Sequence, residues 1–128
     1  SQGFEKGSTI LAKAAEKAAP DKRREALQQV RMGKTAGVIY GSIANQVHFV
    51  QLRDELRNAK TPDARKLEIK SELKKIVRRE MDYAKQLYIL CKEDSTIGFE
   101  STNHYWYVPQ DLVEKIINCQ NILAELDK

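Results

Sequence analysis

The chain has 128 residues, of which 41% are hydrophobic and 31% charged, and its formal net charge is +4. This balance is typical of one folded domain and excludes a disordered or collagen-like chain. No apolar run approaches the roughly 20 residues that a membrane-spanning helix needs, so we expect a soluble chain. The start at Ser1 has no secretion signal, which leaves the compartment open and suits a fragment of a longer protein.

A first helix is predicted from Phe4 to Ala19, with Ser8 or Thr9 available as its cap. Alanine is frequent in this segment, which favours close packing against a neighbouring helix. The residues expected on the packed side are Ile10, Leu11, Ala14, Ala15 and Ala18.

A second helix is predicted from about Asp21 to Asn58. Pro20 and Asp21 mark its start, because proline fits the first helical position and an acidic residue complements the positive end of the helix dipole. In its second half, apolar residues spaced by threes and fours predict one buried stripe. The stripe consists of Ile39, Ile43, Val47, Val50 and Leu56.

Gly33, Gly37 and Gly41 recur at every fourth residue of this helix and therefore share one face. Each costs about 1 kcal/mol of helix stability relative to alanine. We expect that another backbone or a large aromatic side chain packs against this face, or that the helix bends there. The polar and charged neighbours, such as Lys34, argue against a membrane-dimer motif.

A third helix is predicted from Pro62 to about Glu93. Thr61 is its expected cap, Pro62 takes the first helical position and Asp63 lies in the first turn. The expected apolar stripe consists of Ile69, Leu73, Ile76, Val77, Ala84, Leu87 and Cys91.

Basic residues follow one another four apart along the third helix and form a ridge opposite this stripe: Lys66, Lys70, Lys74 and Arg78. Such a ridge suits nucleic acid phosphates or an acidic partner. However, Glu80 and two other acidic residues are interleaved with it, and no aromatic residue for base stacking comes before Tyr83. An ordinary solvated helix face is therefore favoured.

Pro109 opens the last predicted helix, which ends near Leu126. Its expected buried face consists of Leu112, Ile116, Cys119 or Gln120, and Leu123. No strand pattern occurs outside the short stretch 105–108. The expected fold is all-α, an antiparallel bundle of about four helices in one domain over residues 1–128, with two helices roughly 45 to 55 Å long.

Cys91 and Cys119 lie in separate predicted helices and lack the spacing of metal ligands. No metal site and no cofactor is therefore predicted. Two buried thiols are the favoured interpretation, and a disulfide is the alternative.

The segment from Asp94 to Val108 is the one long connection expected outside the helices. Four of the nine aromatic residues of the chain fall within it, and such rings suit stacking on a sugar or anchoring a protein contact. The equally weighted alternative is that the loop folds back and caps the open end of the bundle. The interface or ligand candidates are Asp94, Phe99, Glu100, Asn103, His104, Tyr105, Trp106 and Tyr107.

Two catalytic arrangements can be drawn from this loop, and neither is favoured. Asp94 and Glu100 match the two carboxylates of a glycosidase, but isolated loop acids more often act as caps or hydrogen-bond acceptors. Ser95 or Ser101 with His104 matches a nucleophile and base, but no orienting acid or oxyanion site is evident. We expect no enzyme activity from this domain alone.

Three consecutive stretches carry a family resemblance: Glu80-x-x-x-Ala84-x-x-Leu87, then Asp94-Ser95-x-Ile97-Gly98-Phe99-Glu100-Ser101-x-x-x-Tyr105, then Pro109-x-x-Leu112-x-x-Lys115-Ile116. Two upstream stretches continue it: Phe4-Glu5-x-Gly7-x-x-x-Leu11-x-x-Ala14 and Asn45-x-x-x-Phe49-x-x-x-Arg53-Asp54-x-Leu56. This pattern resembles a helical region that follows the catalytic barrel in large bacterial proteins assigned to the glycoside hydrolases. The resemblance implies a carboxy-terminal accessory domain, a periplasmic or extracellular parent protein, and catalytic residues that belong to the barrel.

The function that we expect is that of a non-catalytic helical accessory domain of a carbohydrate-active protein. Its 94–108 loop is expected to dock on the catalytic domain of the same polypeptide or to line the substrate cleft, near carbohydrate. The alternative is a free-standing helical interaction protein that binds an acidic partner or nucleic acid through its third helix. Nucleic acid is the less favoured partner, and no membrane partner is expected.

Overall fold

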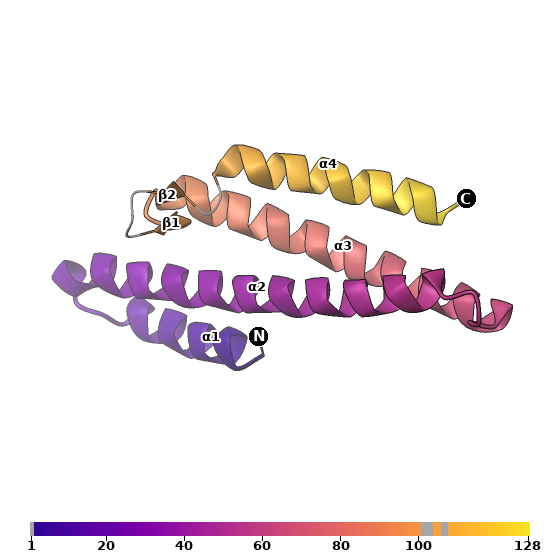
Figure 1. Ribbon diagram of the computed structural model, residues 1–128. Coiled ribbons are helices and arrows are strands. Elements are labelled where there is room, and N and C mark those ends of the chain that lie inside the picture. The colour runs from indigo at the N-terminus through magenta and orange to yellow at the C-terminus, as the bar shows by residue number, and fades with distance from the viewer. Residues whose placement is uncertain (1, 101–103, 106–107) are drawn as a thin grey trace.

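The computed structural model describes residues 2–100, 104–105 and 108–128, with side chains described for residues 3–98 and 108–128. It contains four helices and a two-stranded hairpin: α1 (Gln2–Glu16), α2 (Pro20–Arg57), α3 (Asp63–Glu93), β1 (Phe99–Glu100), β2 (His104–Tyr105) and α4 (Pro109–Leu126). The expected all-α antiparallel bundle with two long helices is confirmed (Figure 1). Within the described ranges, no helix is long and apolar enough to cross a membrane.

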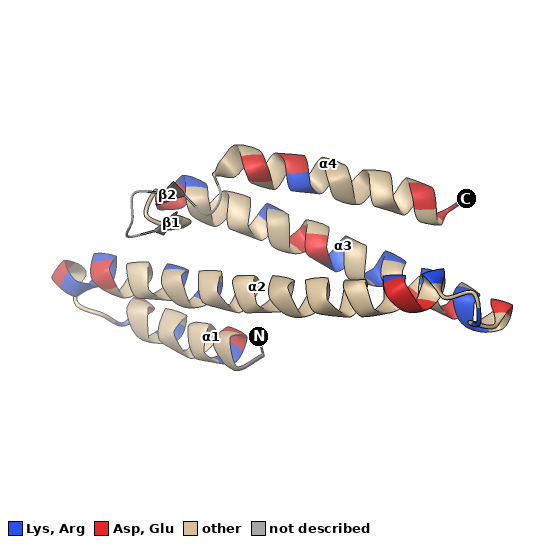
Figure 2. Ribbon diagram, viewed as in Figure 1, with Lys and Arg blue, Asp and Glu red and all other residues tan. Residues whose placement is uncertain are grey.

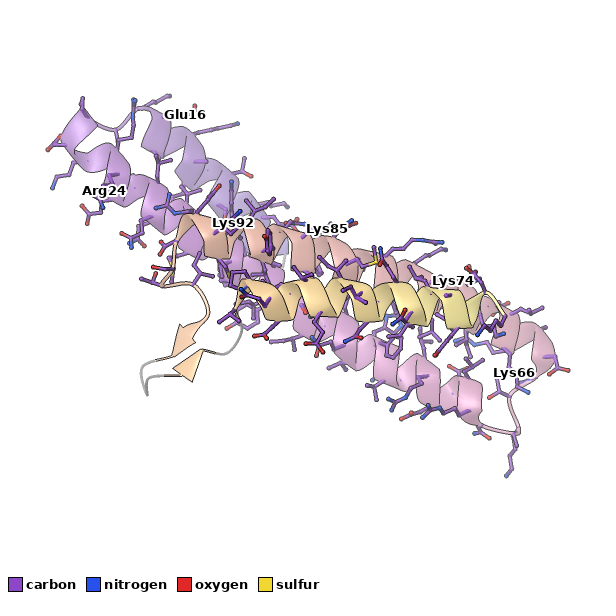
Figure 3. The ribbon with its side chains drawn as sticks, turned by 90° about the horizontal axis from the view of Figure 1, so that it is seen from above. Glu16, Arg24, Lys66, Lys74, Lys85 and Lys92 are labelled. Atoms are coloured by element: carbon purple, nitrogen blue, oxygen red, sulfur yellow. The ribbon has the colours of Figure 1, made fainter. Side chains whose placement is uncertain are left out.

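The helices lie side by side in chain order, and their backbones approach closely only between neighbours in the sequence (Figure 1). In the described part of the chain, α1 packs on α2, and α4 packs on α3 and reaches α2 through the Lys115 side chain, whose Nζ donates to the Ser42 hydroxyl at 3.2 Å. The turns after α1 and after α2 lie at opposite ends of the molecule, where Figure 3 labels Glu16 and Lys66. The helices therefore form an open array in which α1 and α4 lie at the two edges, rather than a closed four-helix bundle.

Prolines set the starts of the long helices, as expected, although the caps differ in detail. Pro20 is the first residue of α2, and the Arg23 Nη2 donates to the Glu16 carbonyl at 2.7 Å, which satisfies the end of α1. The prediction that Thr61 caps α3 was wrong. Pro62 occupies the cap position, and the Thr61 hydroxyl donates back to the Glu55 carbonyl at 2.7 Å, so it closes α2 instead.

The apolar stripes of α3 and α4 are buried where the spacing predicts. One hydrophobic cluster consists of Val38, Leu87, Leu90, Cys91, Ile97 and Leu112, and a second consists of Leu52, Ile69, Leu73 and Ile76. Both cysteines are buried and free, which confirms their interpretation as thiols. The buried residue Glu80 lies on α3 between the two clusters.

The glycine face of α2 receives neighbouring groups at close range, as predicted. A Cβ on Gly41 would lie 2.6 Å from the Tyr83 hydroxyl oxygen, and one on Gly37 would lie 3.0 Å from the Phe4 Cβ. α2 continues through the glycines as one helix. Their lack of side chains therefore serves the close approach of α1 and of an aromatic ring from α3.

The packed side of α1 differs from the expectation. Ile10 is 70% exposed, whereas Ser8 is buried. Ser8 is not a cap, because α1 begins six residues earlier and the side chain fits the space that Gly33 leaves open. The small polar residue is buried here because the glycine face admits only a short side chain.

The basic ridge of α3 is also less free than expected. Lys66 forms an ion pair with Asp63 at 3.3 Å, and Lys74 pairs with Asp127 after the end of α4. The side chains of Lys66 and Lys74 are partly covered, so the ridge begins beside the apolar stripe rather than opposite it. Part of its charge is neutralised within the chain.

Candidate functional site

The 94–108 segment begins with a tight turn that Asp94 organises. The Asp94 Oδ1 accepts hydrogen bonds from the Thr96 backbone N–H at 3.0 Å and from the Thr96 hydroxyl at 2.6 Å. These bonds, with a smaller contribution from Arg31, hold the pKa of Asp94 below its ordinary value. Asp94 therefore acts as a hydrogen-bond acceptor at the end of α3, which is the interpretation that the sequence favoured.

Ile97 anchors the next part of this segment in the hydrophobic cluster with Leu90 and Leu112. Gly98 follows with φ at 87°, a left-handed conformation that disfavours other residues, and directs the chain into β1. The strands then pair Phe99 with Tyr105 and Glu100 with His104.

The remaining candidates lie largely outside the described part of the structure. The side chains of Phe99, Glu100, His104 and Tyr105 are outside it, as are three whole residues: Asn103, Trp106 and Tyr107. The aromatic loop therefore stays a prediction, and so do its docking role and the choice between a contact surface and a cap on the bundle.

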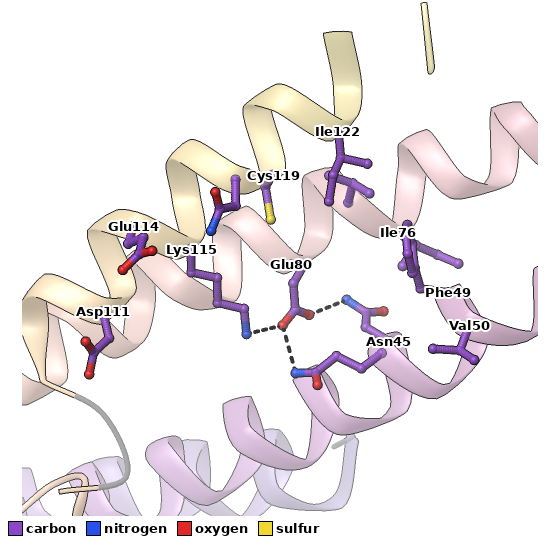
Figure 4. A pocket seen from close by; sticks show the side chains of 13 residues that line it. Asn45, Phe49, Val50, Ile76, Glu80, Asp111, Glu114, Lys115, Cys119 and Ile122 are labelled. Atoms are coloured by element: carbon purple, nitrogen blue, oxygen red, sulfur yellow. Dashed lines mark hydrogen bonds and ion pairs between the residues drawn. The ribbon is translucent and has the colours of Figure 1, made fainter. Parts of the chain in front are cut away.

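A groove of about 400 Å³ lies between α2 and α4, with α3 as its floor (Figure 4). Its apolar walls come from all three helices and include Phe49, Ile76 and Ile122. Asn45, Glu80 and Lys115 form a polar centre on its floor and sides (Figure 4). The groove exists because α4 packs on α3 at a distance from α2, and the Lys115 side chain spans this distance with a hydrogen bond to the Ser42 hydroxyl at 3.2 Å.

Glu80 joins the three helices through its buried carboxylate. Its Oε1 accepts a short hydrogen bond from the Ser42 hydroxyl, and its Oε2 accepts one from the Asn45 Nδ2 at 3.1 Å. Lys115 of α4 forms an ion pair with the same carboxylate, and Gln46 Nε2 lies 3.4 Å from Oε1. Because both carboxylate oxygens have partners, the network stabilises the arrangement of α2 and α4 around α3.

This network was missed in the sequence, where Glu80 was assigned to the solvated ridge. That assignment was wrong, because Glu80 is buried. The available signal was its position: Glu80 follows Ile76 by four residues and precedes Ala84 by four, which places it on the apolar stripe. Ser42 and Asn45 gave a second signal, as polar residues in the uncharged stretch of α2 from Thr35 to Leu52.

The groove does not assemble a reactive nucleophile from its described residues. Cys119 lines it, but burial raises the pKa of this thiol, and the nearby Glu80 carboxylate raises it further. A raised pKa keeps the sulfur protonated at neutral pH. Among the described residues, no group of three or more His, Cys, Asp or Glu side chains is placed to hold a metal ion.

The middle of α2 carries the most unusual surface of the described chain. No Asp, Glu, Lys or Arg occurs from Thr35 to Leu52, and Figure 2 shows this stretch without charge colours between coloured helix ends. Tyr40, Ile43, Val47 and Val50 lie along its outer side and are 56%, 51%, 55% and 42% exposed. We call these four residues the seam.

The seam corrects the prediction for α2. Ile43, Val47 and Val50 were expected in the core, but the buried face of the helix consists of other residues: Val30, Thr35, Gly37, Val38, Gly41, Ser42, Asn45 and Leu52. The glycines bring α1 and Tyr83 onto one side of the helix, and the apolar stripe is left on the opposite side. Phe4 of α1 stacks on Tyr40 with ring centroids 5.4 Å apart and extends the exposed apolar surface.

The seam and the groove adjoin. Val50 belongs to the seam and also lines the groove, so the apolar surface continues from the outer side of α2 toward α4.

Comparison of the chain with protein-family models, with curated proteins and with solved structures finds no match.

Proposed function

We propose that this chain is a non-catalytic helical docking module whose seam packs against an apolar face of a protein partner. The observation that carries the proposal is the uncharged stretch from Thr35 to Leu52 with large apolar side chains on its outer side. Interface centres are depleted in charged residues and enriched in aromatic and aliphatic ones. A contiguous exposed apolar patch on a folded domain marks an interaction site.

The spacing of the seam supports a helical partner. Tyr40, Ile43, Val47 and Val50 follow one another at three, four and three residues, which is the a and d pattern of a coiled coil. A stripe this narrow suits the line of contact with one other helix, whereas a helix in a globular core needs a wider apolar face. The partner therefore presents a helix with its own apolar stripe.

The glycoside hydrolase parent remains a proposal that rests on the sequence resemblance alone. Docking of the 94–108 loop on the catalytic domain is likewise a proposal that rests on the sequence, with four of the nine aromatic residues of the chain in this loop. Binding of nucleic acid through α3 is not favoured, since Lys66 and Lys74 are engaged by carboxylates of the chain.

Photo-crosslinking in the complete native protein tests the docking role. A benzophenone amino acid placed at Val47 is expected to give one defined adduct, mapped by mass spectrometry to an apolar helical peptide. The matched control is the same probe at Lys75, an exposed position on α3. Equal labelling from both positions, or none from Val47, would contradict the proposal.

A stability measurement separates a docking surface from a misassigned core. The Ile43→Lys, Val47→Lys double variant is expected to keep its helicity and to unfold at nearly the same temperature, because surface substitutions change stability by about 0.5 kcal/mol or less each. Loss of folding in this variant would place the seam in the core of the domain and overturn the proposal.

A further inference from the structure

We infer that the partner of the seam is a second copy of this chain, whose α2 pairs antiparallel with α2 of the first copy about a two-fold axis. The inference rests on the proposed docking function and names its partner. It is drawn from three features of the seam: the symmetry of its spacing, its lack of charge, and its accessibility.

The spacing of the seam reads the same in both directions along α2. Tyr40, Ile43, Val47 and Val50 are separated by three, four and three residues, so reversing the helix reproduces the pattern. A two-fold axis through the middle of the pattern places Ile43 opposite Val47 of the second copy and Tyr40 opposite Val50 of the second copy. Each layer then pairs a larger side chain with a smaller one, which is how packed layers interdigitate.

A two-fold contact requires a surface that tolerates a copy of itself. Elsewhere on the chain, the 22 basic and 18 acidic residues can meet a second copy favourably only where the two-fold axis places opposite charges against each other. The stretch from Thr35 to Leu52 contains none of these residues and therefore brings no like charges together. The seam is thus a surface of α2 on which self-contact carries no electrostatic cost.

The seam is exposed along its length. Its four side chains are 42% to 56% exposed; α1 approaches α2 at the glycines and covers part of the seam only where Phe4 stacks on Tyr40. Ala36 precedes the seam by one helical turn and Asp54 follows it by one turn. In the antiparallel register, Asp54 of one copy lies beside the small Ala36 of the other, where it reaches solvent at the edge of the contact.

The contact is short, which sets the expected strength. The helix rises about 1.5 Å per residue, so the seam extends for only roughly 15 Å. Contacts well below the standard interface size of about 1,600 Å² are typical of weak and reversible assemblies. We therefore expect a monomer and a dimer in exchange, with the dimer fraction rising with protein concentration.

Sedimentation velocity over a wide concentration range tests the assembly. The unmodified chain is expected to shift from monomer to dimer, and Ile43→Lys is expected to remain monomeric, since two lysines would then face the opposing seam. Ile89→Lys is the matched control, because Ile89 is 56% exposed on α3 and Ile43 is 51% exposed. A monomer at every concentration, or a dimer that Ile43→Lys leaves intact, overturns the inference.

Site-directed crosslinking tests the register. An equimolar mixture of Ile43→Cys and Val47→Cys chains, treated with a short bismaleimide, is expected to give more covalent dimer than either variant alone. Preferential dimer from Ile43→Cys alone indicates parallel pairing and overturns the antiparallel arrangement. Crosslinking through the buried native thiols Cys91 and Cys119 is the background signal, and treatment of the unmodified chain with the same reagent measures it.

The two proposals fail in different ways. If the chain stays monomeric while the Val47 probe in the complete protein labels a peptide of another domain or protein, self-pairing is wrong and docking stands. If the seam variants unfold, or if the Val47 probe labels nothing, both are wrong.

Discussion

The two long helices lie side by side but present different outer surfaces. The outer side of α3 carries charged residues along its length, and several of them form ion pairs with neighbours. The outer side of α2 carries apolar residues and no charge from Thr35 to Leu52. The outer surface of α3 is therefore a typical solvent-exposed helix surface. The outer surface of α2 is an exposed apolar surface of the kind that a partner covers.

The largest expected effect comes from the inner face of α3. Leu73→Ala should destabilise the chain by about 2 to 5 kcal/mol, because Leu73 is almost fully buried and its removal leaves a cavity. Leu67→Ala is the matched control, since Leu67 lies on the same helix and is 71% exposed. Chemical denaturation measures both, and similar losses would contradict the assigned faces of α3.

The second-largest loss of stability is expected at the polar centre of the groove. Glu80→Ala removes the acceptor for Ser42 and Asn45 and the partner of Lys115, and we expect a loss of roughly 1 to 3 kcal/mol. Glu68→Ala also breaks an ion pair on α3, but an exposed one, and should cost less than about 1 kcal/mol. If the two variants are equally stable, Glu80 does not tie α4 to the two long helices.

The inner face of α2 can be tested at its glycines. Gly41→Ala should destabilise the chain, because the new Cβ meets the Tyr83 ring, and overpacking of roughly 1 to 3 kcal/mol exceeds the gain in helix propensity of about 1 kcal/mol. Gly7→Ala meets no atom within 4 Å and should stabilise α1. Thermal unfolding of both variants decides the point, and equal stabilisation would show that Tyr83 does not need the space at Gly41.

The smallest expected effect is the response to acid. The pKa values of Glu55, Asp94 and Asp127 are lowered by hydrogen bonds from Arg65, Thr96 and Lys74. A carboxyl whose pKa is lower in the folded state stabilises the fold above its unfolded pKa, and this contribution is lost as the pH falls through the folded value. The side chains of Glu55 and Asp127 are 41% and 66% exposed, and that of Asp94 is 10% exposed, so we expect only a modest loss of thermal stability below about pH 4, to which Asp94 contributes most. Asp94→Asn should reduce that loss, and an unchanged pH profile would argue against the Asp94 turn.

The sequence predicted α3 and α4 well and the orientation of α2 poorly, for one physical reason. On α3, apolar residues lie on one side and charges on the other, so the spacing alone identifies the buried face. On α2, both sides between Thr35 and Leu52 are uncharged, and the spacing of Ile43, Val47 and Val50 is compatible with either a core or a contact surface. The glycines decide the matter, because their short distance to α1 and to Tyr83 places the opposite side in solvent.

The candidate site was less predictable than the fold. Glu80 was hidden among surface acids of the same helix, and its partners come from positions 38, 35 and 34 residues away in the chain and from Lys115 of α4. Such a network depends on how far apart α2 and α4 lie, which no local pattern reports. Asp94 was correctly interpreted as a hydrogen-bond acceptor, because its short contact with Thr96 is local.

Packing in chain order has a consequence for how the chain folds and opens. Close backbone contacts join only helices that follow one another along the chain, and helical topologies of this kind fold quickly. In the described residues, α1 packs on α2, and α4 packs on α3 and reaches α2 through the hydrogen bond from Lys115 to Ser42, so either outer helix can detach while the pair of α2 and α3 persists. Amide protons of α1 and α4 should therefore exchange with solvent in separate events, before those of α2 and α3.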